Sequence, residues 1–378
     1  MKVKLKDIAT YINGKAFKPS EWEETGLPII RIQNLNNSAK EYNYYNKEID
    51  EKYIIEAGDI LISWSASLDI FEWKSEKAVL NQHIFKVIFD KDIEVDKNYF
   101  KLAISNTLHI LEKYTHGSTM KHIVKKDFEN IEIPLPSLTK QKEIAQTLDK
   151  ASELIELRKA TIQKLDELAQ SIFIDMFGDP KDKYNHDQCY ELDDLTERIT
   201  DGEHQTPKRT DSGTLLLSAR NIQQGFIDII NEKVDYIGES EVLRINKRLK
   251  IEKDDVLLSC SGTIGRVTTN TLNENFCIVR SVAIIRPNIQ KILPRYLVAY
   301  LQTSFMQIKM NTEANSSGQP NLFQNQIKKL KIFLPEPEKQ NEFVHTIEKI
   351  ESQKFLYEAE LTKLQASFDA LLSQSFEG

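Results

Sequence analysis

The chain has 378 residues, of which 40% are hydrophobic and 28% charged, the balance of an ordinary globular protein, and its formal net charge is −7. This length predicts two or three domains. No stretch approaches the roughly 18 apolar residues that span a membrane, and the N-terminal Met1–Asp7 lacks an apolar signal region, so we expect a cytoplasmic protein. The three cysteines have no C-x-x-C spacing, which argues against a disulfide framework or a cysteine zinc site.

Residues 1–137 have the pattern of a mixed α/β domain. Short runs rich in β-branched and aromatic residues, at Pro28–Ile32, Asp59–Ser63 and His83–Phe89, predict strands separated by Gly, Asn and Asp turns. Tyr99–Leu111 has the apolar spacing of a helix.

A second domain, residues 178–337, repeats this order. Gly213–Asn221 is similar to Gly26–Asn34, and Asp255–Ser259 is similar to Asp59–Ser63. The apolar strand cores are kept while the loops differ in length, which is how recognition modules diverge.

Each domain is followed by the same boundary and a long helix. Ile133–Pro136 returns 199 residues later as Ile332–Pro335, and a Lys-Gln pair follows both. A repeat this long indicates duplication of a whole domain with its helix, because solenoid repeats have periods of roughly 20 to 50 residues. The pattern predicts helices over residues 138–177 and 338–378.

Apolar residues recur with spacings of three and four along both helices, interrupted by Arg158 in the first and by Lys354 in the second. This pattern is typical of a coiled coil, in which polar core residues fix the register at some cost in stability. At 1.5 Å per residue, about 38 residues form a rod of roughly 57 Å. The predicted pairing residues are Leu148, Ala151, Ile155, Ile162 and Leu165 in the first helix and Ile347, Ile350, Tyr357, Leu361 and Leu364 in the second.

Two arrangements of these helices fit the pattern. Either each helix covers the sheet of its own domain, or the two pair antiparallel as a spacer between the domains. The length of the rod and the order domain, helix, domain, helix favour the spacer. The predicted fold is therefore α+β, with two mixed α/β domains separated by two long helices that pair as an antiparallel coiled coil, in a pseudo-twofold internal repeat.

The net charge of −7 argues, by itself, against a nucleic-acid partner. Counted by segment, however, residues 338–378 carry a net charge of −4, whereas residues 177–337 are neutral and residues 1–137 carry only −2. Local basic patches on near-neutral domains would permit DNA binding.

Catalytic motifs are missing from the sequence. It contains neither G-x-x-x-x-G-K-[ST] nor a G-x-G-x-x-G after a predicted strand, so nucleotide hydrolysis and a Rossmann cofactor are not supported. The sequence also lacks the Asn-Pro-Pro-aromatic or Asp-Pro-Pro-aromatic tetrapeptide expected of amino-methylating DNA methyltransferases, and it has no paired metal-ligating histidines. We therefore expect a binding protein that holds no metal.

Five further features occur in a fixed order along the chain. They are Gly117–Thr119, Phe173–Pro180, Ile199–Pro207, Ser259–Gly265, and the Leu-Pro pairs at Leu135 and Leu334. Each is a weak signal, but together they resemble the specificity subunit of type I restriction–modification systems, over essentially the whole chain and including its duplicated plan. The first domain departs from the pattern, because it has Asn13–Lys15 where the second has the fuller Gly202–Pro207.

The resemblance implies a non-catalytic subunit whose two target-recognition domains each read one half of a split, asymmetric DNA sequence, at a separation set by the helices. It implies docking of two methyltransferase subunits, which bind S-adenosylmethionine. It also implies separate restriction subunits, motor-nucleases that use ATP and magnesium. No cofactor is expected on this chain.

Base recognition requires paired donors and acceptors, with Arg suited to guanine and Asn or Gln to adenine, whereas Lys, Arg, Ser and Thr contact phosphates. In the first domain the candidates for base contact are Arg31, Gln33, Asn34, Asn81 and Gln82, and those for phosphate contact are Ser118, Thr119, Lys121, Lys125 and Lys126. In the second domain the candidates for base contact are Arg220, Asn221, Arg280, Gln319 and Asn321, and those for phosphate contact are Thr206, Lys208, Arg209, Thr263 and Arg266.

Each candidate is also compatible with a solvated surface residue. His204 either contacts DNA or ties down its own loop, and Ser261–Arg266 is either a phosphate-binding glycine loop or a turn between strands. For the whole chain, a duplicated coiled-coil scaffold that binds proteins without DNA specificity is the alternative function. A methyltransferase or nuclease is disfavoured by the missing motifs.

Overall fold

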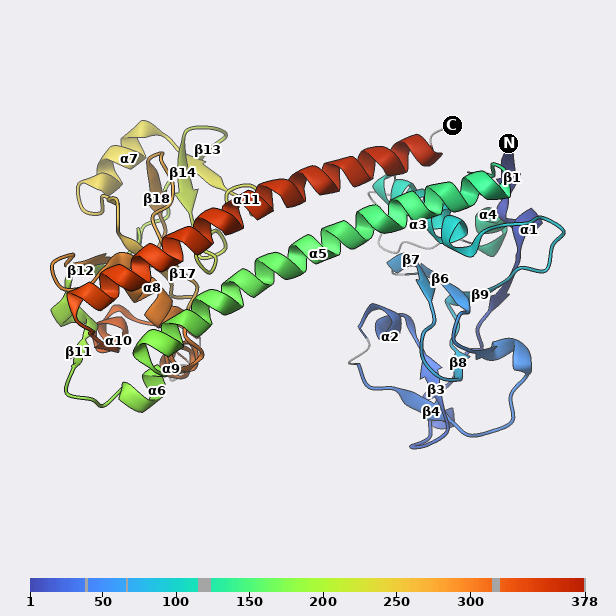
Figure 1. Ribbon diagram of the computed structural model, residues 1–378, viewed down its shortest axis with the longest axis horizontal. Helices are drawn as coiled ribbons and strands as arrows, with labels where there is room; N and C mark the ends of the chain where they lie inside the picture. The colour runs from blue at the N-terminus through green and yellow to red at the C-terminus, as the bar shows by residue number, and fades with distance from the viewer. Residues whose placement is uncertain (38–39, 66, 115–123, 315–319, 377–378) are drawn as a thin grey trace. The chain divides into compact units, whose positions relative to one another are not determined.

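The computed structural model in Figure 1 describes residues 1–37, 40–65, 67–114, 124–314 and 320–376. It divides into two compact units, one made of Met1–Lys159 and Glu360–Gly378 and the other of Ala160–Ala359. None of the helices in the described ranges combines the length and hydropathy that a membrane crossing requires.

The first unit is built on two four-stranded sheets and a two-stranded ribbon. Its strands are β1 (Lys2–Lys4), β2 (Thr10–Asn13), β3 (Leu27–Ile30), β4 (Asn43–Tyr45), β5 (Ile54–Ile55), β6 (Ile60–Ser65), β7 (Ser67–Glu72), β8 (Ala78–Leu80), β9 (Ile84–Ile88) and β10 (Glu132–Pro134). The sheet orders are β2-β9-β6-β7 and β4-β3-β8-β5, and β1 pairs with β10. Its shorter helices are α1 (Leu5–Ile8), η1 (Pro19–Glu21), α2 (Ile32–Asn36), η2 (Glu51–Tyr53), α3 (Lys97–Tyr114) and α4 (Lys125–Glu129).

The second unit has the same three sheets. Its strands are β11 (Cys189–Glu191), β12 (Thr196–Asp201), β13 (Arg209–Thr210), β14 (Thr214–Leu217), β15 (Asp235–Ile237), β16 (Val256–Ser259), β17 (Val267–Thr269), β18 (Phe276–Ile278), β19 (Val282–Pro287) and β20 (Lys331–Phe333). The orders are β12-β19-β16-β17, β13-β15-β14-β18 and β11-β20. Its shorter helices are α6 (Pro180–Lys183), η3 (Leu192–Leu195), α7 (Glu239–Asn246), α8 (Pro294–Gln302), α9 (Ser304–Ala314) and α10 (Gln324–Lys328).

The internal repeat is confirmed strand by strand. In each unit one sheet is antiparallel throughout, and the other contains one parallel pair, β3 with β8 or β14 with β18. Buried contacts repeat as well: the Tyr99 hydroxyl donates to the Pro134 carbonyl and the Tyr296 hydroxyl to the Phe333 carbonyl, each at 2.7 Å. The units differ at both edges of the sheet with the parallel pair, because β5 extends it beside β8 only in the first unit and β13 extends it beside β15 only in the second.

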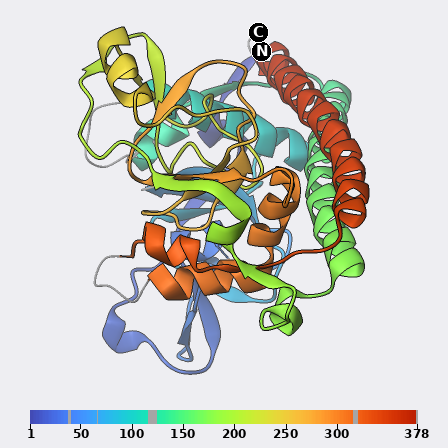
Figure 2. The same cartoon turned by 90° about the vertical axis from the view of Figure 1, so that its left-hand side faces the viewer.

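The two long helices are α5 (Leu138–Phe177) and α11 (Pro337–Phe376), which run antiparallel in each unit (Figures 1 and 2). In the first unit Arg158 Nη2 lies 2.8 Å from Glu360 Oε2, and in the second Lys354 Nζ lies 2.6 Å from Asp166 Oδ1. The two polar residues that interrupt the heptads therefore each form an ion pair across the helix pair. All of the predicted pairing residues are buried or half-buried, and the antiparallel pairing is confirmed.

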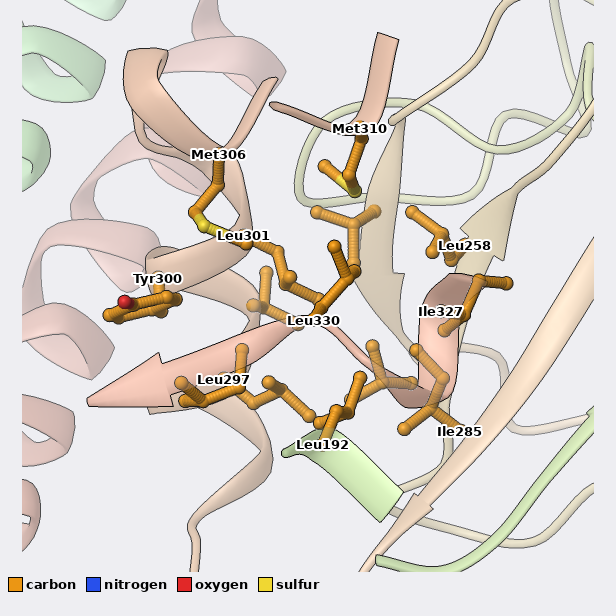
Figure 3. Close-up of a cluster of buried hydrophobic side chains, with 14 of the residues drawn as sticks. Leu192, Leu258, Ile285, Leu297, Tyr300, Leu301, Met306, Met310, Ile327 and Leu330 are labelled. Carbon is orange, nitrogen blue, oxygen red and sulfur yellow. The ribbon is translucent and has the colours of Figure 1, made fainter. Parts of the chain in front are cut away.

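Both long helices contribute to the apolar core of each unit. In the first unit Phe376 from α11 packs with Leu148 from α5. In the second, Phe173 from α5 and Phe343 from α11 are in edge-to-face contact, with ring centroids 5.5 Å apart. Figure 3 shows part of this second core, including Leu258, Leu297 and Ile327. A helix that covered only the sheet of its own domain would not do this.

One strand ends earlier than its composition predicts. Pro28–Ile32 predicts a strand through Ile32, but β3 ends at Ile30 and α2 begins at Ile32. The reason is a local hydrogen bond, because the Arg31 N–H donates to Asn34 Oδ1 at 3.2 Å and closes the first turn of the helix.

Candidate nucleic-acid interface

The same three-residue connection joins the two four-stranded sheets in both units. Asn81–His83 connect β8 to β9, and Val279–Ser281 connect β18 to β19. The Gln82 N–H donates to the Lys15 carbonyl at 2.9 Å, and the Arg280 N–H donates to the Glu203 carbonyl at 3.0 Å. In each connection only the central side chain, Gln82 or Arg280, is exposed.

A glycine lies against each connection because no side chain fits there. A Cβ atom on Gly14 would lie 2.1 Å from the Asn81 carbonyl oxygen, and one on Gly202 would lie 2.2 Å from that of Val279. Both clashes are with backbone, which no side-chain rotation relieves. Gly14 therefore corresponds to Gly202, and the shorter loop of the first domain keeps the glycine of the fuller segment.

Two asparagines predicted to contact bases are buried instead. Asn34 is 3% exposed and Asn221 is 1% exposed. Each amide oxygen accepts a backbone N–H from three residues earlier, and each amide nitrogen donates to two carbonyls of the following loop. The partners are Arg31, Lys40 and Glu41 for Asn34 and Ser218, Asp228 and Lys233 for Asn221. The prediction for these two residues is wrong, because their donors and acceptors hold the loop. The residues just before them, Gln33 and Arg220, are exposed.

In each unit the exposed residues follow the C-terminal ends of the two parallel strands. Because β3 and β8 are parallel neighbours, their C-terminal ends lie side by side, as do those of β14 and β18. The Asn81 N–H donates to the Ile30 carbonyl at 3.1 Å, and the Val279 N–H donates to the Leu217 carbonyl at 3.0 Å. The carboxyl ends of neighbouring parallel strands are a frequent place for ligand sites.

Two predicted arginines already have partners. Arg31 Nη2 donates to Asn43 Oδ1 at 2.5 Å, and the guanidinium lies 5.1 Å from the centroid of the Trp22 ring. Base contact by Arg31 would have to displace Asn43, so the structure does not favour this prediction. Arg209 Nε lies 2.9 Å from Asp235 Oδ2, but its side chain is exposed on the other side and a phosphate contact there stays a prediction.

Glu203 anchors the loop that carries His204. Its side chain is 6% exposed and lies 3.3 Å from Arg244 Nη1 and 3.7 Å from Arg248 Nη2. Burial acts to raise the pKa of Glu203, but the Gln205 N–H and the two arginines outweigh it and hold that pKa below its ordinary value. No local pattern reveals these contacts, because both arginines come from the distant α7 region.

His204 has one contact with the preceding strand, because its Nε2 lies 3.7 Å from Asp201 Oδ2, but its side chain is 61% exposed. Thr206 and Lys208 are exposed beside it. Contact of these three side chains with DNA stays a prediction.

The glycine-containing loop Ser261–Arg266 joins β16 to β17. Gly262 and Gly265 have φ angles of 78° and 90°, a conformation that favours glycine. The Arg266 N–H donates to Ser259 Oγ at 2.9 Å, and Ser261 pairs with Asn321 in an isolated bridge. The loop is thus a turn between strands, with Thr263 exposed at its tip, and its contact with phosphate stays a prediction.

The remaining candidates are placed less completely. Lys125 and Lys126 on α4 are exposed, and Lys125 Nζ lies 3.5 Å from Glu129 Oε1. Ser118, Thr119, Lys121 and Gln319 lie outside the described residues. Within the described ranges, no group of three or more His, Cys, Asp or Glu side chains is placed to hold a metal ion.

Comparisons with known proteins agree with this architecture. The family model described as "Type I restriction modification DNA specificity domain" matches residues 1–167 and 208–366. The EcoBI specificity subunit of Escherichia coli is 26% identical, over 100% of this chain and 85% of that protein. The MjaVIII specificity subunit of Methanocaldococcus jannaschii is 24% identical, over 93% and 85%. The crystal structure of the type I S subunit from M. genitalium shares the fold, with a TM-score of 0.56 at 15% identity over 100% of this chain and 96% of that one. The chain therefore belongs to the family of type I restriction–modification DNA specificity domains.

Proposed function

We propose that this protein is the DNA sequence-specificity subunit of a type I restriction–modification complex. Residues 1–137 and 178–337 act as two target-recognition domains, and each reads one half of a bipartite, asymmetric DNA site. The observation that carries the proposal is the duplicated sheet edge, where Gln82 and Arg280 are exposed on equivalent connections. The glutamine amide pairs a donor with an acceptor and the arginine guanidinium presents two donors, and both patterns distinguish base pairs in the major groove.

The segments 138–177 and 338–378 act as the spacer between the two recognition domains. Both helices take part in both cores, and an ion pair joins them in each unit. A helix pair shared in this way supports a fixed spacing between the two half-sites.

Each unit also has apolar side chains of the helices that are available to partner subunits. In the first unit Leu154 and Leu157 on α5 are 53% and 57% exposed, and in the second Phe355 and Leu356 on α11 are 71% and 55% exposed. Large apolar side chains exposed in this way mark protein interaction surfaces. We assign these residues to the docking of two methyltransferase subunits.

The remaining chemistry belongs to those partners in this proposal. The methyltransferase subunits bind S-adenosylmethionine, and restriction subunits use ATP and magnesium. The chain itself is non-catalytic, holds no cofactor, and works in the cytoplasm where the DNA is. A scaffold that binds proteins without DNA specificity is disfavoured, because the family model covers most of both domains.

Co-expression with a methyltransferase subunit, followed by methylation-sensitive sequencing of the host genome, tests this function. We expect adenine methylation at one split motif that is absent from a host carrying the methyltransferase subunit without this chain. A genome in which no split motif gains methylation would contradict the proposal.

Two changes in the chain test whether each domain reads its own half-site and whether the helix pair sets the spacing. Exchanging residues 178–337 for the matching segment of the EcoBI specificity subunit should change one half-site, and a change in both halves would contradict the assignment. Deleting one heptad from α5 should abolish recognition, because the register with α11 is lost. A matched deletion from both helices should restore recognition with a shorter spacing between the half-sites.

A further inference from the structure

The two units carry different side chains at the same two exposed positions. The first position is Gln33 in the first unit and Arg220 in the second, and the second position is Gln82 and Arg280. Both differences have the same direction, because the first unit has glutamine and the second has arginine each time.

Hydrogen bonds establish that Gln33 and Arg220 are equivalent. Each comes directly before a buried asparagine, whose Oδ1 accepts a backbone N–H from three residues earlier, at 3.2 Å for Asn34 and 3.0 Å for Asn221. The turn fixed by this asparagine follows β3 in the first unit and β14 in the second. The fold therefore leaves the preceding side chain exposed at the same place in both copies.

The second position is equivalent on independent grounds. Gln82 and Arg280 are the central residues of the two connections, and each donates its backbone N–H to the residue after the close-packed glycine. The connection is rigid, because Gly14 and Gly202 leave no room against it. In the second unit a hydrogen bond also joins the residues next to these two positions, since the Ala219 N–H donates to Ser281 Oγ at 3.0 Å.

All four side chains are available to a ligand. Within the part of the chain that the structure describes, no hydrogen bond or ion pair engages the side chain of Gln33, Gln82, Arg220 or Arg280. Their neighbours differ in this respect, because Arg31 and Asn34 are already bonded within the protein.

The common role of these positions is not charge. The second unit has a guanidinium at each position and the first has a neutral amide, so attraction of a phosphate by positive charge is not what the two copies share. A glutamine amide pairs with N6 and N7 of adenine, and an arginine guanidinium pairs with O6 and N7 of guanine. The same two positions can thus read a different base in each half-site with no change in the fold.

We infer that Gln33 and Gln82 read adenines in one half-site and that Arg220 and Arg280 read guanines at the corresponding places of the other. This inference rests on the proposed function, and it names the residues that make the two halves of the site different. Each well-placed pair should favour its own base by about 5- to 150-fold over the wrong one.

Exchange of the two residue types tests the inference in the complex co-expressed with its methyltransferase subunit. Gln82→Arg should change one position of one half-site from adenine to guanine and leave the other half-site unaltered. Arg280→Gln should make the opposite change in the other half-site. Gln33→Arg and Arg220→Gln should act in the same way at a second position of each half.

Matched controls separate recognition from charge and folding. Gln290→Arg adds a charge at an exposed residue between β19 and α8, and Lys253→Gln removes one before β16, so both should keep the original site. If an exchange variant is inactive or melts early, Gln82→Ala and Arg280→Ala replace it, and each should relax one position of its own half-site.

The possible failures are distinguishable. If the wild-type complex methylates a split site and every variant keeps its bases unchanged, the inference falls and the proposed function stands. If the variants that replace Arg220 or Arg280 weaken methylation equally at all sequences, these two arginines contact phosphates and the base assignment is overturned. If the wild-type complex methylates no split site, the proposed function itself fails.

Discussion

Arg286 holds Asp255 through two hydrogen bonds, from Nε to Oδ1 at 2.8 Å and from Nη2 to Oδ2 at 2.9 Å. Asp255 is 1% exposed and also accepts the Glu252 N–H at 2.7 Å. In the first unit the counterpart is Lys86 Nζ, 2.8 Å from Asp59 Oδ2. A guanidinium fixes the orientation of a carboxylate with a planar pair of donors, which an ammonium group cannot do. The second unit is therefore tied more firmly at the start of β16 than the first is at β6.

Asp255→Ala should destabilise the second unit by about 3 kcal/mol, because it removes the buried carboxylate and leaves the Arg286 guanidinium with the more exposed Glu252, 3.3 Å away. Asp59→Ala should cost the first unit less, because the Asp59 side chain is 25% exposed and Lys86 Nζ keeps the Ile54 carbonyl as a partner at 2.8 Å. All three tryptophans lie in the first unit, so urea unfolding followed by tryptophan fluorescence reports that unit, and hydrogen exchange of the β16 amides reports the second. Equal losses in the two variants would contradict this prediction.

Gly14→Ala and Gly202→Ala should each displace the connection that carries the exposed side chain of Gln82 or Arg280. The new Cβ would meet a backbone oxygen at 2.1 or 2.2 Å, and overpacking of this kind costs about 1 to 3 kcal/mol. Only the Gly14 variant should shift the tryptophan fluorescence transition. Gly238→Ala is the control, because its Cβ would meet no atom closer than 3.9 Å. A Gly202 variant as stable as this control would show that the Val279 carbonyl can move freely.

The repeat and the helices were predictable because their signals are local. The boundary at Pro136 and Pro335 and the spacing of apolar residues along α5 and α11 involve only near neighbours in the sequence. The parallel pairing of β3 with β8 was not predictable, since the two strands lie far apart in the chain and no residue pattern marks a strand's partner.

The site residues show where reasoning from residue types fails. Asn34 and Asn221 carry the amide that adenine recognition needs, but the same amide also closes turns after strands, and here it does. Gln33 and Arg220, one residue earlier, stay exposed. The anchoring role of Glu203 was not predicted for a different reason, because its partner Arg244 lies 41 residues later in the chain.

Lys354→Glu should weaken the helix pairing, because it places a third carboxylate beside Asp166 and Glu358. Burial already raises the pKa of Glu358. The original pair is half-exposed, so we expect a coupling energy of about 0.2 to 1 kcal/mol that falls at high salt. A double-mutant cycle with Asp166→Lys measures it, and the double reversal should recover most of the loss. Absence of coupling would mean that this ion pair does not fix the register.

Acid should loosen the loop that Glu203 anchors. Because its pKa in the folded protein lies below the ordinary 4.5, the ionised form stabilises the fold. This contribution is present above pH 4.5 and is lost as the pH falls through the folded pKa. The Arg280 N–H, held by the Glu203 carbonyl, should lose hydrogen-exchange protection over that range. In Glu203→Gln the protection should not vary with pH there, and a wild-type protein that behaved in the same way would contradict the assignment.

The cysteines should differ in their reaction with iodoacetamide. Burial raises the pKa of Cys260 to about 12 and that of Cys277 to about 11, and each is only 2% exposed. Since the thiolate is the reacting form, native protein at neutral pH should be alkylated first at the half-buried Cys189, and in urea all three should react. Mass spectrometry of peptides resolves the three rates.

The two slow cysteines also report on the connection of the second unit that carries Arg280. The Cys260 N–H donates to the Ser281 carbonyl at 2.8 Å, and Cys277 lies on β18, so both flank the connection that carries Arg280. Their alkylation requires that this connection opens. Gly202→Ala should therefore speed the labelling of Cys277 without changing that of Cys189. If both cysteines react faster to the same extent, the substitution has loosened the whole unit rather than the connection.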